Sequence, residues 1–128
     1  MDIRALIKEE VLAQKAYPVD NAAYRIKLDA NENPLAIPEP LREKFAALLA
    51  SVPLNRYPEA GSARLAARFA KAFGVGADQV IIGNGSDDLI QILCTALARP
   101  GAEMMIPVPT FAMYRITGVN TGLGVQEV

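Results

Sequence analysis

The stretch Val80-Ile-Ile-Gly-Asn-Gly-Ser-Asp-Asp88 decides the fold that this sequence predicts. Its apolar residues 80–82 predict a short buried strand, and a glycine-containing turn at 83–86 follows directly. Residues 87–98 are strongly apolar and predict a helix. The order of strand, glycine turn and helix is typical of a βα unit in a parallel sheet.

The residues after this helix repeat the alternation. Pro100-Gly101 stops the helix, and residues 104–106 predict a second strand. Pro109-Thr-Phe111 leads into another helical stretch, and residues 123–128 predict a third strand. We therefore expect an α/β fold whose parallel sheet is connected by right-handed crossovers.

Three further helices are predicted before this region. Apolar residues near helical spacing predict a short amphipathic helix over 1–14, and a second helix runs from Pro38 to near residues 51–53. A third helix opens at Gly61-Ser62 and ends at Gly74, which is a plausible C-terminal cap. Its expected buried side carries Leu65, Phe69 and Phe73.

The composition excludes several kinds of chemistry. The chain has 128 residues, no histidine and one cysteine, Cys94. Without histidine it can form no Ser-His-Asp triad, Cys-His pair or imidazole metal site. One cysteine forms neither an internal disulfide nor a Cys-rich metal cage, so we expect no metal site. The 13 Lys+Arg and 14 Asp+Glu give a net charge of −1, which provides no basic footprint for nucleic acid.

No segment resembles a membrane anchor or a signal peptide. The apolar runs are much shorter than the ~20 residues that span a bilayer. The first ten residues mix acidic and basic side chains with apolar ones, unlike a signal peptide. A free Cys94 fits a reducing compartment, so we expect a soluble, cytoplasmic protein.

The junction between the glycine turn and its helix is a candidate anion site. Open N–H groups and the helix dipole attract anions there, and the glycines allow close approach to the backbone. Ser86 could add a hydroxyl donor. The same residues also fit an ordinary βα turn, with Ser86 as N-cap and Asp87 and Asp88 favouring the dipole. The pattern is neither G-x-G-x-x-G nor GxxxxGK[ST], so it supports neither dinucleotide nor nucleoside triphosphate binding.

Phe111 and two polar segments are further candidates. Phe111 follows the second strand, and ligands of open α/β sheets bind beyond the carboxyl ends of strands. Its ring could cover a flat ligand, or it could simply pack in the core. The Asn and Tyr side chains of residues 29–34 and 55–58 are either functional or turn-forming.

Five motifs in register resemble the N-terminal part of the histidinol-phosphate aminotransferases, a family of fold-type-I aminotransferases that use pyridoxal phosphate (PLP). The motifs are Tyr17, Asp29-Ala-Asn-Glu-Asn-Pro34, Asn55-Arg-Tyr-Pro-Glu59, Gly83-Asn-Gly-Ser-Asp-Asp88 and Pro109-Thr-Phe-Ala-Met-Tyr114. The resemblance implies an N-terminal arm and the first βα units of the large domain, with an incomplete parallel or mixed sheet. It places residues 1–50 in the arm and part of the small domain, and residues 51–128 at the beginning of the PLP-binding large domain.

The resemblance also implies how the cofactor is held. The turn of Gly85, Ser86 and Asp87 would bind the PLP phosphate, largely through backbone N–H groups, and Phe111 would stack on the pyridine ring. Tyr57 would reach the cofactor phosphate of the other subunit, in a homodimer with a shared active site.

The implied reaction transfers an amino group between histidinol phosphate and a 2-oxo acid (2-oxoglutarate, with glutamate as donor) in histidine biosynthesis. Tyr17 and Asn31 would lie near the substrate. The resemblance also makes Val108–Pro109 a candidate cis peptide bond.

The resemblance places no catalytic residue within this chain. The Schiff-base lysine, its acidic partner and the substrate-binding arginine are expected beyond Val128, so the chain alone is expected to be inactive. Lys71 sits in Phe69-Ala-Lys-Ala-Phe-Gly74, which looks like the Schiff-base segment. It precedes the phosphate turn, however, and we expect it on a solvated helix face.

Three other functions also fit the sequence. One is another fold-type-I PLP enzyme, such as an aromatic aminotransferase or a threonine-phosphate decarboxylase. The second is a non-catalytic fragment that forms dimers through exposed sheet edges. The third is a small phosphate-binding module.

Overall fold

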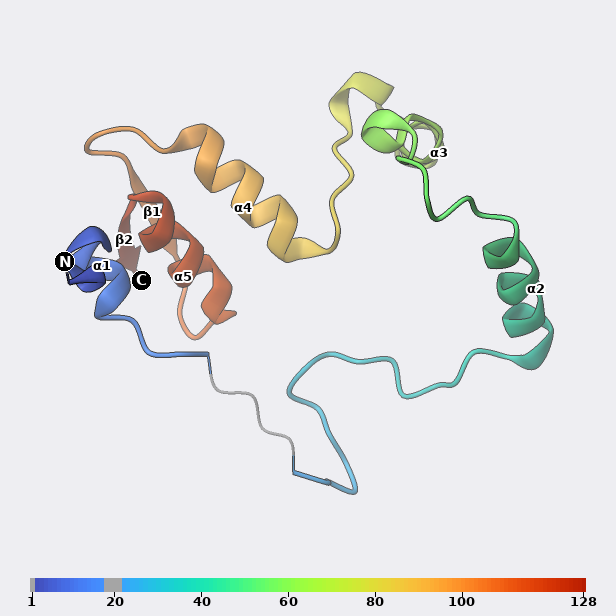
Figure 1. The fold of residues 1–128 in the computed structure, drawn as a ribbon, viewed down its shortest axis with the longest axis horizontal. Coiled ribbons are helices and arrows are strands. Elements are labelled where there is room, and N and C mark those ends of the chain that lie inside the picture. The colour runs from blue at the N-terminus through green and yellow to red at the C-terminus, as the bar shows by residue number, and fades with distance from the viewer. Residues whose placement is uncertain (1, 18–21) are drawn as a thin grey trace. The chain divides into compact units, whose positions relative to one another are not determined.

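The computed structural model describes residues 2–17 and 22–128 (Figure 1). The chain divides into two compact units. The first unit consists of the N-terminal arm and Ala60–Val128, and the second is the segment between them. The domain boundary expected near residue 50 stays a prediction.

The N-terminal arm forms two short turns, so the prediction of one helix over residues 1–14 is wrong. A 3₁₀ turn spans Ile3–Leu6, and α1 spans Glu9–Leu12. The Asp2 carboxylate accepts the Arg4 N–H at 3.0 Å, which favours a separate first turn. So short a helix is marginal without packing. The arm gains tertiary contact at Lys8, whose Nζ donates to the Asn120 carbonyl oxygen at 3.4 Å.

Helix α2 spans Glu39–Ala50 in the second unit and confirms the helix predicted from Pro38. Pro38 is its N-cap, and a second proline lies in its first turn, where a missing N–H costs nothing. Ser51 ends the helix, and its hydroxyl donates to the Leu48 carbonyl at 2.7 Å. Its apolar side chains remain exposed in the described structure; they are Leu41, Phe45, Leu48 and Leu49.

Helix α3 spans Ala63–Phe73 after a 3₁₀ turn at Ala60–Ser62, and it ends at Gly74 in the left-handed conformation (φ 69°), as predicted. The prediction of its buried side is wrong. Ala66 and Ala70 are buried, whereas the larger apolar side chains Leu65, Phe69 and Phe73 are exposed. Helical periodicity identifies which residues share a face, but burial also requires a partner to cover that face.

The strand predicted at residues 80–82 does not form among the described residues. Val80 has extended dihedral angles (φ −121°, ψ 124°), but no described segment pairs with residues 80–82. A strand is defined by its ladder of hydrogen bonds to a neighbour. Ile81 is accordingly 64% exposed, while Val80 and Ile82 are only half-buried.

The following elements confirm the predicted α/β order. They are α4 (Ser86–Leu97), β1 (Glu103–Ile106), α5 (Ala112–Thr121) and β2 (Gly124–Glu127). Strands β1 and β2 are parallel, with Glu103 opposite Gly124 and Ile106 opposite Glu127, and α5 connects them (Figure 1). The structure therefore contains a βαβ unit whose two strands form a small parallel sheet.

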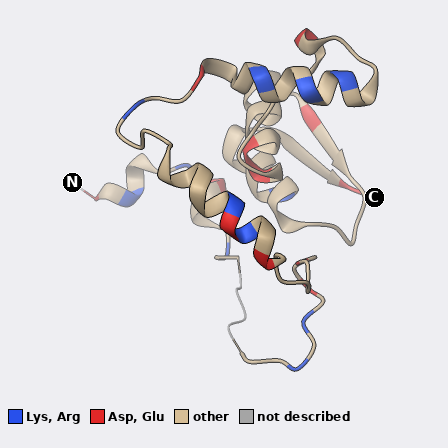
Figure 2. Ribbon diagram, turned by 90° about the vertical axis from the view of Figure 1, so that its right-hand side faces the viewer, with Lys and Arg blue, Asp and Glu red and all other residues tan. Residues whose placement is uncertain are grey.

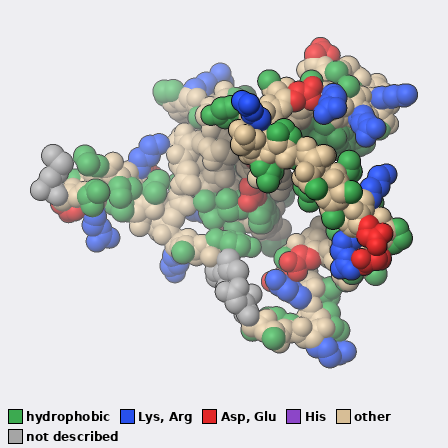
Figure 3. All heavy atoms as spheres, turned by 45° about the vertical axis from the view of Figure 1, so that its right-hand side comes forward, with side chains coloured by type: hydrophobic (Ala, Val, Ile, Leu, Met, Phe, Trp, Pro, Cys, Tyr) green, Lys and Arg blue, Asp and Glu red, His purple; other side chains and the backbone are tan. Residues whose placement is uncertain are grey.

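A small core lies beside this βαβ unit. Ile90 and Cys94 of α4 are buried against Leu123, and Met104 and Tyr114 pack partly buried around them. Large apolar side chains remain exposed elsewhere, and Figure 3 shows many of them on the visible face. In the described part of the chain, no helix is both long and apolar enough to cross a membrane.

We expect Cys94 to react slowly with thiol reagents in the folded chain. Burial raises the pKa of its thiol above the ordinary value of 9.0, because the charged thiolate loses hydration. Because the folded state holds this proton more tightly than the unfolded state, the protonated thiol contributes to the stability of the fold. This contribution is complete below pH 9.0 and decreases as the pH rises further. The test is labelling with a chromogenic disulfide at neutral pH, with and without urea. Equal rates in both conditions would contradict the prediction.

Candidate functional site

The N-terminus of α4 presents backbone N–H groups that no described side chain caps. Gly85 is its N-cap, with φ 84° and ψ 178°. The first N–H groups of a helix have no intrahelical acceptor, and together with the dipole they favour an anion. Ser86 is the first helical residue. The alternative in which Ser86 serves as N-cap is therefore wrong.

The space beside Gly85 is open, which distinguishes it from Gly83. A Cβ atom built on Gly83 would lie 2.9 Å from Leu89 Cδ2 and 3.0 Å from Asp88 Oδ2, so Gly83 packs closely against the first turn of α4. A Cβ on Gly85 would meet no heavy atom of the described residues within 4 Å, leaving aside its chain neighbours. Gly85 is therefore the glycine at which a ligand could approach the backbone.

The two acidic residues of this turn are placed differently. Asp88 Oδ2 accepts the backbone N–H of Asn84 at 2.9 Å, which ties its carboxylate to the turn that precedes the helix. Asp87 is exposed. The carboxylate of Asp88 thus has a backbone donor of its own, and this bond also fixes the turn on which Gly85 lies.

Phe111 lies beyond the C-terminal end of β1, as predicted. It is the N-cap of α5, with φ −64° and ψ 124°, and it follows the Val108–Pro109 peptide bond, which is cis as expected. Phe111 is 42% exposed, so the alternative in which it packs in the core is wrong. An aromatic ring that is partly exposed at a strand end can cover a flat ligand.

Two tyrosines contact Phe111. The Tyr17 ring centroid lies 6.4 Å from that of Phe111 with an interplanar angle of 85°, and the Tyr114 centroid lies 6.3 Å away at 88°. The sequence analysis predicts Tyr17 near the substrate and Phe111 on the cofactor ring. In the structure the two aromatic rings are in contact. Tyr114 is not among the site residues predicted from the sequence, although its i+3 spacing from Phe111 is a signal for contact at the start of a helix.

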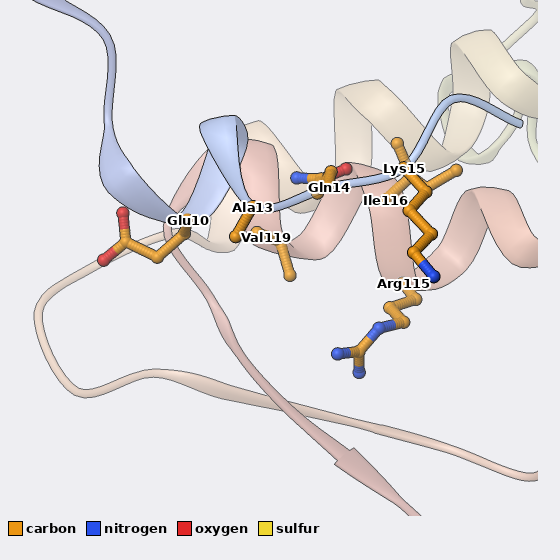
Figure 4. A pocket seen from close by; sticks show the side chains of 7 residues that line it. All are labelled: Glu10, Ala13, Gln14, Lys15, Arg115, Ile116 and Val119. Atoms are coloured by element: carbon orange, nitrogen blue, oxygen red, sulfur yellow. The ribbon is translucent and has the colours of Figure 1, made fainter.

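The N-terminal arm reaches Phe111 by packing along α5. Gln14 Nε2 donates to Asn120 Oδ1 at 2.8 Å, and the arm continues from there to Tyr17. A cavity of about 550 Å³ lies between arm and helix, and Figure 4 shows its lining side chains: Glu10, Ala13, Gln14, Lys15, Arg115, Ile116 and Val119. Arg115 also donates to Glu127 Oε1 at 2.9 Å, which connects α5 to β2. None of the sequence-predicted site residues lines this cavity.

Asn31 and Tyr57 belong to the second unit. Asn31 has φ 51°, a left-handed conformation that Asn tolerates better than most residues. Tyr57 is fully exposed. In the same polar segment as Asn31, Asn33 Oδ1 accepts the Leu35 N–H at 3.0 Å, so at least this asparagine forms a turn.

Lys71 is exposed on α3, in agreement with the expected solvated face. Arg64, Arg68 and Lys71 recur along this helix, and Figure 2 shows basic residues along it. Within residues 2–17 and 22–128, no group of three or more His, Cys, Asp or Glu side chains could hold a metal ion.

These features define an α/β protein with an open helix N-terminus and an aromatic side chain beyond a strand end. The family described as aminotransferase class I and II matches residues 24–128. The chain therefore belongs to the class I and II aminotransferases.

Several relatives carry the same name. Histidinol-phosphate aminotransferase 1 of Burkholderia lata is 45% identical over 113 residues, covering 88% of this chain and 32% of the relative. The histidinol-phosphate aminotransferase of Chromobacterium violaceum is 43% identical over 124 residues, covering 96% and 35%. That of Caldanaerobacter subterraneus is 34% identical over 122 residues, covering 92% and 35%. The chain thus spans about a third of the length of these relatives.

Proposed function

We propose that this chain is part of a PLP-dependent enzyme that transfers an amino group between histidinol phosphate and 2-oxoglutarate in histidine biosynthesis. The observation that carries the proposal is the open N-terminus of α4 at Gly85, in a member of an aminotransferase family. The names of the relatives support histidinol phosphate as the substrate.

The residues at the start of α4 fit a phosphate group. A phosphate needs several converging donors, and the helix N-terminus offers N–H groups without intrahelical partners. The proposed ligands are the backbone N–H groups of Gly85, Ser86 and Asp87, with the Ser86 hydroxyl as a further donor. Two observations support these ligands. The space at Gly85 is open, and the Asp88 carboxylate accepts a hydrogen bond from the Asn84 N–H within the turn.

Phe111 is proposed to cover the pyridine ring of the cofactor. When bound, PLP would supply the electron sink for amino transfer. Phe111 would orient that ring through its aromatic face and exclude water from one side. Neither Tyr17 nor Tyr114 lies parallel to Phe111, so neither ring takes the parallel stacking position that a flat ligand would use. Tyr17, adjacent to Phe111, is proposed to face the phosphate end of the substrate.

Asn31 and Tyr57 are proposed to complete the site in a cytoplasmic homodimer. Asn31 would lie near the substrate, and Tyr57 would donate its hydroxyl to the cofactor phosphate of the partner subunit. The full exposure of Tyr57 leaves its side chain available for such a contact. The beginning of the large domain is proposed near residue 51.

The proposed reaction is tested by assaying the product of the gene that encodes this sequence. The formation of glutamate from 2-oxoglutarate is measured with histidinol phosphate and with an aromatic amino acid as amino donors. The release of carbon dioxide is measured separately with threonine phosphate. Turnover is expected with histidinol phosphate at a clearly higher kcat/KM. A preference for either of the other substrates would instead favour an aromatic aminotransferase or a threonine-phosphate decarboxylase.

The proposed cofactor site is tested by a binding titration of the 128-residue chain, which we propose binds the cofactor without turnover. Pyridoxamine 5′-phosphate is the suitable probe, because it has no aldehyde to react with exposed lysines such as Lys71. We expect saturable binding of this probe and weaker binding of inorganic phosphate. Equal affinity for both ligands would support only a phosphate-binding module, and the absence of saturable binding would contradict both functions.

A further inference from the structure

We propose that Tyr114 is a positioning residue that holds the Phe111 ring ready for a flat, phosphorylated ligand. The inference rests on the proposed function, in which Phe111 covers the pyridine ring. It adds a residue to which neither the sequence motifs nor the family relationship assigned a role.

The first observation is that the Phe111 side chain is partly exposed and that its described ring contacts are with Tyr17 and Tyr114. Phe111 is the N-cap of α5, and its carbonyl oxygen accepts the Tyr114 N–H at 3.3 Å. Its ring is 42% exposed. An exposed side chain exchanges rotamers rapidly, and a ligand that binds one rotamer must fix it at an entropic cost.

The second observation is that Tyr114 connects Phe111 to the core. Tyr114 is half-buried and packs against the buried cluster of Ile90, Cys94 and Leu123. Its ring centroid lies 6.3 Å from that of Phe111 at an interplanar angle of 88°. The Tyr114 ring is held by the core, and it therefore restricts the rotation of the partly exposed Phe111 ring.

The angle between the rings matters for the role. A ring stacked parallel on Phe111 would occupy the position that a ligand needs. The perpendicular arrangement restricts Phe111 without taking the parallel stacking position. Tyr17 contacts Phe111 at a similar angle, but it comes from the N-terminal arm, whereas Tyr114 lies on the same helix that Phe111 caps.

The test compares two ligands on four forms of the 128-residue chain: the wild type, Tyr114→Leu, Tyr114→Phe and Leu123→Ala. Titrations with pyridoxamine 5′-phosphate and inorganic phosphate give the ratio of the two affinities, which isolates the contribution of the aromatic ring. We expect Tyr114→Leu to lower this ratio about two- to tenfold, because Phe111 must then be ordered on binding. Tyr114→Phe keeps the ring and should keep the ratio.

The Leu123→Ala variant controls for loss of stability. Leu123 belongs to the same buried cluster, and its truncation should lower the urea midpoint while leaving the affinity ratio unchanged. A ratio that stays at the wild-type value in Tyr114→Leu would overturn the positioning role, as would an equal fall in Leu123→Ala. If the wild type itself shows no preference for pyridoxamine 5′-phosphate, the proposed function fails together with this inference.

Discussion

Replacing Gly85 with alanine should weaken the proposed phosphate binding at the start of α4 by about tenfold or more. Gly85 has φ 84° and ψ 178°, a backbone region that is essentially restricted to glycine. Alanine must either hold this conformation at a cost of about 1–3 kcal/mol or rotate away from it. Rotation turns the N–H groups of the turn away from the anion, and losing one hydrogen bond to a charged group reduces affinity by about tenfold or more. Titration with inorganic phosphate and pyridoxamine 5′-phosphate measures the loss.

Gly101→Ala is the matched control for Gly85→Ala. Gly101 also has a positive φ, 76°, and a Cβ there would likewise meet no described heavy atom within 4 Å. It lies in the turn between α4 and β1, at the other end of the helix. Both variants should lower the urea midpoint, but only Gly85→Ala should lose affinity for both ligands. An equal loss of binding in the two variants would mean that general destabilisation, and not the geometry of the turn, removes the site.

The order of elements after residue 83 could be predicted from the sequence because local signals determine it. Pro100-Gly101 interrupts the chain between α4 and β1, and short apolar runs on either side of α5 have the length of strands. The burial of α3 and the pairing of residues 80–82 could not be predicted in this way. Both depend on contacts with segments distant in the sequence, and the described residues provide no such partner for Phe73 or Ile81.

In the candidate site too, features with a local sequence signal could be predicted, whereas contacts between distant segments could not. The open helix N-terminus at Gly85 could be predicted because a glycine turn before a helix has a local sequence signature. The contact of Tyr17 with Phe111 joins residues far apart in the chain and needs the arm to pack along α5. Phe111 is predicted from its place after a strand and Tyr17 through the family resemblance, but neither argument predicts their contact. Tyr114 packs against the core cluster, and its residue type and place on a helix predict this core position better than a role beside Phe111.

Replacing Gly118 with valine should destabilise the βαβ unit strongly. Gly118 is buried in α5, where glycine ordinarily costs a helix about 1 kcal/mol relative to alanine. Its role is close packing: an added Cβ would lie 3.0 Å from Val125 Cγ2 on β2 and 3.3 Å from Met104 Sδ on β1. A valine adds two further methyl groups and should lower the free energy of unfolding by about 1–3 kcal/mol. Urea unfolding followed by circular dichroism measures the change.

A second substitution separates this steric cost from a change in helix propensity. Val125→Ala removes the methyl groups that lie nearest to the added Cβ, so it should cost some packing alone but restore stability when combined with Gly118→Val. We expect the double variant to be more stable than the sum of the single effects by at least about 0.5 kcal/mol. Helix propensity is a property of α5 alone and would give additive losses. Rescue by a residue on β2 therefore identifies the contact between helix and strand as the reason for glycine at position 118.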